Sequence, residues 1–291
     1  MNRIVLVYKK TLIDIFKEKA FESVFEEKRY ALFNQIKKSH YNHEKSIENV
    51  LNILEKIGIK TVIYARGSGR MPVIKENDLA VSLGGDGTFI FTSHHCKKNH
   101  ILGLNSAPQT SIGHYCHAIY AGETQKLERL FDKILSGREK PRQIQRLDFF
   151  INNKFCGVPV INDVLVSESS PCTTSRYIIK YNQKSQSQKS SGIWITTATG
   201  SSAAYYSAGG KVFEAFNKKK QRQFAFQVRE LYGPKKDSIR NGMVNENDKF
   251  KVISGMARGK IFLDGSHRFF SFIFGDELTV KFSKNPLLVF N

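Results

Sequence analysis

The feature that most constrains the fold is a change of pattern near residue 141. Before it, short continuous apolar runs alternate with longer segments of helical spacing. Parallel strands that are covered on both faces are apolar throughout, so this alternation predicts βαβ units around a parallel sheet. The expected strands are residues 4–8, 60–64, 79–83 and 101–104, and helices are expected within 11–54, 89–96 and 123–135.

After Pro141 the chain becomes a succession of short runs rich in β-forming residues, most of them separated by turn residues. The expected strands are residues 147–151, 158–166, 177–181, 192–196, 250–253, 259–263, 269–274 and 278–282. This pattern predicts a β-rich second domain. Within it, we expect a helix at 207–216 and, from its polar composition, an exposed hairpin loop at 182–191.

We therefore expect an N-terminal Rossmann-like α/β domain and a C-terminal β-sandwich-like domain. The expected boundaries are 1–141 for the first domain and 142–275 for the second, with 276–291 returning to the first. Hydrophobic residues make up 41% of the 291, with 22 Phe, which excludes an intrinsically disordered chain. No apolar run approaches the roughly 20 residues of a membrane-spanning helix. The N-terminus lacks the features of a signal or transit peptide, so we expect a cytoplasmic protein.

The charge of the chain is strongly basic. Lys and Arg number 45 against 26 Asp and Glu, a formal net charge of +19. Such a surface attracts nucleotides, polyphosphate, nucleic acid or acidic lipid, although a general solubility role explains the charge equally well. The runs Lys218–Lys220 and Lys235-Lys236 suggest a basic nucleic-acid-binding protein as one alternative. Runs of this kind are more commonly solvated loops, so no specific nucleic acid and no membrane is expected as a partner.

The strongest local motif is Gly84-Gly-Asp-Gly-Thr88, which stands between an expected buried strand and an expected helix. Glycines there permit a tight turn and close backbone approach to a phosphate, and a helix N-terminus supplies unpaired N–H groups. An aspartate in such a loop repels phosphate. Its presence is explained if Asp86 takes a proton from a hydroxyl beside that phosphate. The loop is neither a Walker A loop nor a Gly-x-Gly-x-x-Gly fingerprint.

Two further motifs carry polar groups in unusual settings. Residues 197–210 form a Ser/Ala/Gly-rich turn after a β run, where small residues let a ligand lie against the backbone and hydroxyls offer hydrogen bonds. Asn162 and Asp163 interrupt a strongly apolar run, and buried polar groups are costly without partners. Taken singly, tight packing and strand-end capping explain these two motifs better than a site does. A bound polyol is the functional alternative.

Together and in this order, the three motifs resemble the NAD kinase family. The loop at 84–88 matches the family's signature, Asn162-Asp163 resembles its Asn-Glu pair, and 197–210 resembles its Thr-Pro-Thr-Gly-Ser-Thr-Ala-Tyr stretch ending in Ser-Ala-Gly-Gly. Similar segments also include Gly103-Leu-Asn105, Gly113-His-Tyr115 and Asp264-Gly265. The resemblance runs from about residue 60 to 280. Ala204 where the family has tyrosine, Ser191 where most members have aspartate, and Thr-Ala-Thr-Gly are closer to its mitochondrial-type branch than to the common bacterial type.

The resemblance implies transfer of the ATP γ-phosphoryl group to the 2′-hydroxyl of the adenosine ribose of NAD, giving NADP. It implies that Asp86 is the general base and that Mg²⁺ accompanies ATP. No metal-binding residue is expected from the sequence. A homo-oligomer, either dimer or tetramer, is expected. The residues expected to contact the nucleotides are Gly85, Gly87, Thr88, Asn105, Asn162, Asp163, Thr199, Ser202, Ala203 and Tyr205, the first three of the glycine loop through backbone N–H groups.

A lipid kinase of the diacylglycerol or sphingosine type is a second alternative, because such enzymes share the Gly-Gly-Asp-Gly-Thr loop. They also resemble each other in an acidic residue followed by Asn-Gly in the next helix. That pattern is missing from Phe89–His95. The sequence leaves open whether polyphosphate replaces ATP and whether NADH is accepted as well as NAD.

Overall fold

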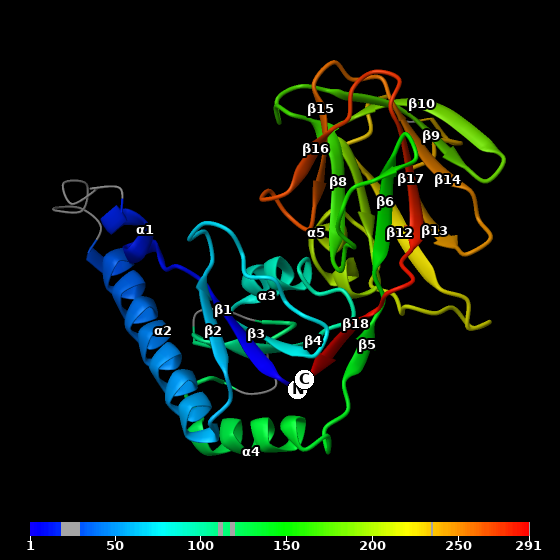
Figure 1. Ribbon diagram of the computed structural model, residues 1–291. Helices are drawn as coiled ribbons and strands as arrows, with labels where there is room; N and C mark the ends of the chain where they lie inside the picture. The colour runs from blue at the N-terminus through cyan, green and yellow to red at the C-terminus, as the bar shows by residue number, and fades with distance from the viewer. Residues whose placement is uncertain (19–29, 110–112, 117–119, 234, 291) are drawn as a thin grey trace. The chain divides into compact units, whose positions relative to one another are not determined.

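The computed structural model describes residues 1–291 apart from 19–29, 110–112, 117–119, 234 and 291. The chain divides into two compact units (Figure 1). Unit 1 consists of Met1–Gln143 and Leu287–Asn291, and unit 2 consists of Ile144–Pro286. Each unit has its own core and is described separately.

Unit 1 is built on a six-stranded sheet of order β2-β1-β3-β4-β18-β5. Strands β1, β2, β3, β4 and β18 pair in parallel, as the continuous apolar runs predict. The last paired strand comes from the far end of the chain. The strands are β1 (Arg3–Tyr8), β2 (Thr61–Ala65), β3 (Asp78–Gly84), β4 (His100–Asn105), β5 (Arg142–Ile144) and β18 (Leu287–Phe290).

Helices cover both faces of this sheet (Figure 1). Ile4 and Leu6 of β1 belong to the larger core cluster, to which α2 and α4 contribute, whereas Val5 and Val7 pack with Tyr64 and Phe91. Successive strand residues point to opposite faces, so each face has its own apolar layer. The helices are α1 (Leu12–Glu18), α2 (Tyr30–Ile57), α3 (Asp86–Ser93) and α4 (Thr124–Leu135).

Unit 2 contains two six-stranded sheets of antiparallel pairs, of order β10-β9-β14-β17-β6-β7 and β13-β12-β11-β8-β15-β16. Buried side chains from both sheets, such as Phe149 and Phe226, form one core cluster. This is the expected sandwich. The strands are β6 (Leu147–Ile151), β7 (Lys154–Phe155), β8 (Asp163–Glu168), β9 (Ser175–Tyr181), β10 (Lys184–Ser190), β11 (Gly192–Thr196), β12 (Gln223–Arg229), β13 (Asn241–Asn245), β14 (Phe250–Ser254), β15 (Gly259–Leu263), β16 (Phe269–Ser271) and β17 (Glu277–Phe282).

Two local expectations in unit 2 were wrong. The polar stretch at 182–191 is not a loop, because Lys184–Ser190 forms β10 at the edge of a sheet, paired with β9. An edge strand tolerates such a sequence, since its solvent side needs no apolar residues. The helix expected at 207–216 is instead the single turn α5 (Ala204–Ser207), which ends before Gly209 at a positive φ of 91°.

The unit bounds also differ from the expected domain bounds. The first change of unit lies between Gln143 and Ile144 rather than after residue 141, and the return to unit 1 begins at Leu287 rather than at 276. Strand β17 accounts for the second difference. It stays in unit 2 because it pairs with both β6 and β14. Among the described residues, no helix has both the length and the apolar character needed to cross a membrane.

Gly103 of β4 is required by close packing. A Cβ at this position would overlap the Tyr115 carbonyl oxygen and lie 2.9 Å from both Cys116 Sγ and Phe89 Cδ2. The Phe89 and Tyr115 rings are stacked with centroids 4.9 Å apart, which holds the 113–116 segment against this strand.

We predict that Gly103→Ala lowers the free energy of unfolding by about 1–3 kcal/mol, as overpacking of a dense interior typically does. Urea denaturation followed by circular dichroism measures the change. An unchanged midpoint and slope would mean that the 113–116 segment moves aside without cost.

Candidate functional site

The glycine loop joins β3 to α3 at the carboxyl edge of the parallel sheet. Gly84 ends the strand, Gly85 caps the helix, and Asp86 is its first residue. A Cβ on Gly84 would lie 2.8 Å from Thr88 Oγ1, so only glycine lets the first helical turn pack this closely. A carboxylate in the first turn is also favoured by the helix dipole.

The Asp86 carboxylate is half-buried and held by two backbone donors. The N–H of His114 donates to Oδ2 at 3.0 Å, and the N–H of Tyr115 donates to Oδ1 at 2.9 Å. A third donor would still find room, because each carboxylate oxygen has two acceptor directions. The loop therefore presents a carboxylate of fixed orientation with lone pairs left over.

Asn105 lies beside this loop, as expected of two parallel strands that end at the same edge. It is opposite Gly84 in the register of β3 and β4, and its Oδ1 accepts the Ala107 N–H at 2.9 Å. The side chain is buried at 5% exposure. The Asn105 side chain thus stabilises the turn after β4 through this hydrogen bond.

Thr88 lies in the first turn of α3, and its expected contact with phosphate stays a prediction. Its backbone N–H donates to the Gly85 carbonyl oxygen at 2.9 Å, and the residue is only 3% exposed. In this structure the Thr88 N–H is thus used within the first helical turn. Gly85 is partly exposed and Gly87 exposed, as phosphate-facing residues must be.

Two cationic side chains flank the glycine loop. Neither was predicted from the sequence. Arg66, just after β2, donates from Nη1 to the Gly87 carbonyl oxygen at 2.9 Å, and its guanidinium lies 5.0 Å from the Phe91 ring centroid. Lys9 follows β1, and its Cβ lies 3.6 Å from the position a Cβ would take on Gly84. Burial lowers the pKa of both side chains. Lys9 directly follows the strand predicted at 4–8, and Arg66 stands two residues beyond the strand predicted at 60–64. A basic residue at the end of a predicted parallel strand is the sequence signal that could have identified both.

Neither cation forms an ion pair with a carboxylate in the described part of the chain. A partly buried positive charge without a counterion is unfavourable, so an anionic ligand would stabilise both groups. The backbone of Lys9 is also fixed, because buried His43 donates from Nε2 to its carbonyl oxygen at 2.8 Å. Burial, with the nearby Lys9 charge, lowers the pKa of His43 to about 4, so the imidazole is neutral.

In unit 2, the remaining candidate residues cluster around the start of β8. The Asp264 carboxylate accepts three backbone N–H bonds, from Ile161 at 3.0 Å, Asn162 at 2.8 Å and Asp163 at 3.1 Å. Asp264 itself has a positive φ of 51° and donates its N–H to the Asp163 carbonyl oxygen at 2.8 Å. These hydrogen bonds fix the backbone of Asn162 and Asp163 at the start of β8.

The 197–210 turn packs directly against this pair. Thr197 Oγ1 donates to the Ile161 carbonyl oxygen at 2.6 Å, and a Cβ on Gly200 would overlap the Asn162 carbonyl. The backbone N–H of Ala204 lies near the Asp163 carboxylate and lowers its pKa, against the larger effect of burial. The structure therefore brings together the second and third sequence motifs.

The residues expected to line a dinucleotide pocket differ in exposure. Ser202 is exposed, and Thr199 and Ala203 are partly exposed, so a ligand can reach all three. Tyr205 is 5% exposed, and its ring packs edge-on against Phe213. The Tyr205 ring therefore packs in the interior, and its expected contact with the dinucleotide stays a prediction. The neighbouring Tyr206 is 60% exposed.

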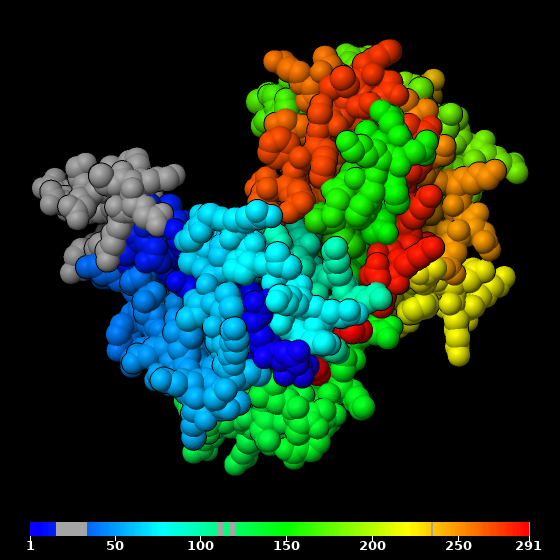
Figure 2. Space-filling model, in the orientation of Figure 1, coloured from blue at the N-terminus to red at the C-terminus, as the bar shows by residue number. Residues whose placement is uncertain are grey.

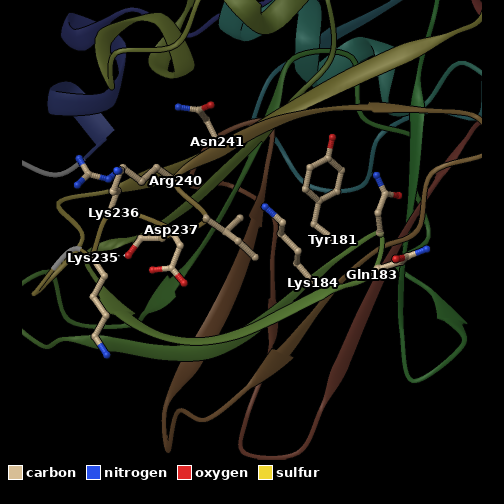
Figure 3. Close-up of a pocket in the computed structure, with 11 residues that line it drawn as sticks. Tyr181, Gln183, Lys184, Lys235, Lys236, Asp237, Arg240 and Asn241 are labelled. Carbon is tan, nitrogen blue, oxygen red and sulfur yellow. Dashed lines mark hydrogen bonds between the residues drawn. The ribbon is translucent and has the colours of Figure 1, made fainter.

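A separate hollow of about 650 Å³ lies between the β9–β10 turn and residues 235–241 (Figure 3). Tyr181, Lys184, Lys236 and Arg240 are among its lining residues. None of the predicted site residues lines it. Its basic side chains are exposed, which is consistent with a solvated surface.

Comparisons with known proteins agree with the resemblance. No family model matches. A probable NADH kinase of Oryza sativa subsp. japonica is 28% identical over 84% of this chain and 80% of its own length. The NADH kinase of Arabidopsis thaliana is 28% identical over 85% and 83%. An NAD kinase of Clostridium kluyveri is 32% identical over 57% and 58%.

Two solved structures share the fold. The NAD kinase of Archaeoglobus fulgidus in complex with ATP has a TM-score of 0.68 at 19% identity, over 99% of this chain and 93% of that one. The yeast NADH kinase complexed with NADH has a TM-score of 0.65 at 15% identity, over 99% and 82%. The chain is thus similar to NAD and NADH kinases over most of its length, in sequence and in fold. The expected α/β domain followed by a β-rich domain is confirmed. The relatives and both solved structures are named NAD or NADH kinases, which supports the expectation of a kinase.

Asp163 gives this chain a distinctive pH dependence of stability. Burial, and secondly the nearby Asp264 charge, raise the pKa of Asp163 to about 7. An unfolded aspartate titrates near pH 4, so between about pH 4 and 7 the folded state binds more protons than the unfolded state. The stability from Asp163 is therefore fully present below about pH 4 and is lost as pH rises through 7.

We predict that Asp163→Asn, which cannot ionise, becomes more stable relative to the parent as pH rises from 5 to 8. Urea denaturation at both pH values measures the difference, with the exposed Asp237→Asn as the charge-matched control. A relative stability that does not change with pH would mean that Asp163 remains ionised in the folded state.

Proposed function

We propose that this chain transfers the γ-phosphoryl group of ATP to the 2′-hydroxyl of the adenosine ribose of NAD, with Asp86 as general base. The observation that carries the proposal is the Asp86 carboxylate itself. It is held by two backbone N–H groups at a helix start and has two uncompensated cations beside its loop. A base next to an anion site is what phosphoryl transfer to a hydroxyl requires.

Asp86 would act through orientation as much as basicity. The N–H groups of His114 and Tyr115 occupy one acceptor direction on each oxygen. A ribose hydroxyl that donates to a remaining direction would be aligned for attack and would lose its proton to the carboxylate. General-base help of this kind typically contributes about 10²–10⁴-fold to the rate.

Lys9 and Arg66 would hold the phosphates of the donor. Both are partly buried cations without carboxylate partners in the described chain, and Arg66 is already fixed by its bond to the Gly87 carbonyl oxygen. These donors, with the exposed N–H of Gly87, suit phosphate oxygens rather than a metal ion. Mg²⁺ would therefore arrive on ATP as part of the donor substrate, where it neutralises charge on the transferred group.

The polar groups of unit 2 would bind the dinucleotide. Asn162 and Asp163 would hydrogen-bond ribose hydroxyls or the nicotinamide end, and Thr199, Ser202 and Ala203 would form the surface along it. The names of the plant relatives and the yeast structure with bound NADH support testing NADH as an acceptor beside NAD. Cytoplasmic location and assembly into a dimer or tetramer are part of the same proposal.

One assay tests this function against its rivals. Purified protein is incubated with Mg-ATP and NAD or NADH, and NADP or NADPH is measured. Polyphosphate replaces ATP in one arm, and diacylglycerol or sphingosine replaces the dinucleotide in another. Phosphorylation of lipid without NADP or NADPH would contradict the proposal, and so would salt-resistant, sequence-selective nucleic acid binding without kinase activity.

We predict that Asp86→Asn lowers kcat at least about 10²-fold, because the amide cannot accept the hydroxyl proton. Steady-state rates with NAD and Mg-ATP measure the loss. Since the Asn amide can turn its NH₂ toward a backbone N–H, a thermal melt and calorimetric NAD binding are recorded for the same variant. A folded, NAD-binding variant with near-parent kcat would exclude Asp86 as the base.

We predict that Arg66→Ala and Lys9→Met each raise KM for ATP, while KM for NAD changes little. Loss of one charge-assisted bond, worth about 1.5–3 kcal/mol, corresponds to a rise of about ten- to a hundredfold. Arg70→Ala is the matched control, because Arg70 is exposed and follows β2 in the same segment. Equal effects on both KM values, or an equal effect in the control, would contradict a specific role at the donor phosphates.

A further inference from the structure

Two helices of unit 1 bring together three side chains that commonly bind metals. Asp14 lies in the first turn of α1, and His40 and Glu44 are four residues apart on α2, so they share one face of that helix. One ligand atom from each lies within 4.8 Å of the other two. Figures 1 and 2 show α1 beside the first part of α2 at the surface of this unit.

Thr11 fixes two of the three side chains. Its N–H and Oγ1 donate to Asp14 Oδ2 at 2.8 and 2.7 Å, and the same hydroxyl lies 2.8 Å from His40 Nδ1. Asp14 Oδ1 is left facing His40, 3.8 Å from Nδ1. Hydrogen-bonded supports of this kind orient the imidazole and carboxylate ligands of metal sites.

The cluster joins two carboxylates to one imidazole, and His40 and His43 help to lower the pKa of Asp14. Asp14 and Glu44 bring two carboxylates together, and Glu44 forms no ion pair or hydrogen bond with any described residue. Like charges at this separation repel, and a divalent cation between them would remove the repulsion. Asp14 and His40 are partly exposed and Glu44 is exposed, so an ion could enter and water could complete its coordination.

We propose that Asp14, His40 and Glu44 bind a divalent transition-metal ion such as Zn²⁺, which ties α1 to α2. An imidazole with two carboxylates suits Zn²⁺ or Mn²⁺, whereas Mg²⁺ and Ca²⁺ prefer oxygen ligands alone. None of the three ligands is Asp86 or a donor cation, and the proposal does not depend on the proposed function. The site is near Lys9, because Thr11 follows it by two residues and His43 contacts both Lys9 and the charges of Asp14 and His40.

Calorimetric titration of the tag-free protein with Zn²⁺ tests the proposal. The Cys172→Ser variant serves as parent, because Cys172 is an exposed free thiol that would compete for the metal. We expect one Zn²⁺ per chain and a melting temperature that rises with Zn²⁺ concentration, since a ligand of the folded state stabilises it. Mg²⁺ at the same concentration should give no such rise.

Glu44→Gln is the decisive variant, because the side chain is exposed and its replacement should leave the fold intact. It should weaken Zn²⁺ binding at least about tenfold. Glu48→Gln, one turn further along α2 and also exposed, should bind like the parent. His40→Gln, with its fold checked by circular dichroism, should lose the site as well.

Three results would overturn the proposal: no stoichiometric Zn²⁺ binding by the parent, unchanged binding in Glu44→Gln, or an equal loss in Glu48→Gln. An equal response to Mg²⁺ would also contradict it, because the imidazole would then play no part.

Discussion

The candidate active site of unit 1 depends on one carboxylate that accepts backbone N–H groups. Asp86 is joined to the 113–116 segment through the amides of His114 and Tyr115. The same segment lies against Gly103, where a side chain would not fit. The loop after β3 and the segment after β4 are therefore one assembly, and the position of the Asp86 carboxylate follows from the packing of both.

Unit 2 uses the same kind of interaction in a more buried setting. Asp264 accepts three successive backbone N–H groups and so fixes Asn162 and Asp163. The three bonds stabilise a buried charge that would otherwise be costly. The consequence falls on Asp163, whose pKa is raised to about 7 by burial and by this neighbour. Asp264 thus fixes the backbone of its neighbours through three hydrogen bonds, and Asp163 has a pKa near 7.

Helix α2 supports the carboxyl edge of the sheet in unit 1 through polar side chains on one face. His43 donates to the Lys9 carbonyl oxygen, Ser46 donates to the Ser106 carbonyl oxygen, and Asn49 donates to the Ala121 carbonyl oxygen. These carbonyls belong to segments that follow β1 and β4. A spacing of three residues places the donors along one side of the helix. The helix therefore fixes the loops around the proposed phosphate site as well as covering the apolar sheet.

The sequence by itself determined the parallel sheet, the β-rich second unit and the position of the glycine loop, because continuous apolar runs, β-forming runs and glycine spacing are local properties. Tertiary structure alone decided what depends on neighbours distant in the chain. It paired the polar strand β10 at a sheet edge, placed Tyr205 in the interior, and used the Thr88 N–H within the turn. It also brought Lys9 and Arg66 to the glycine loop, because strands β1 and β2 end at the same edge as β3 only once the sheet has formed.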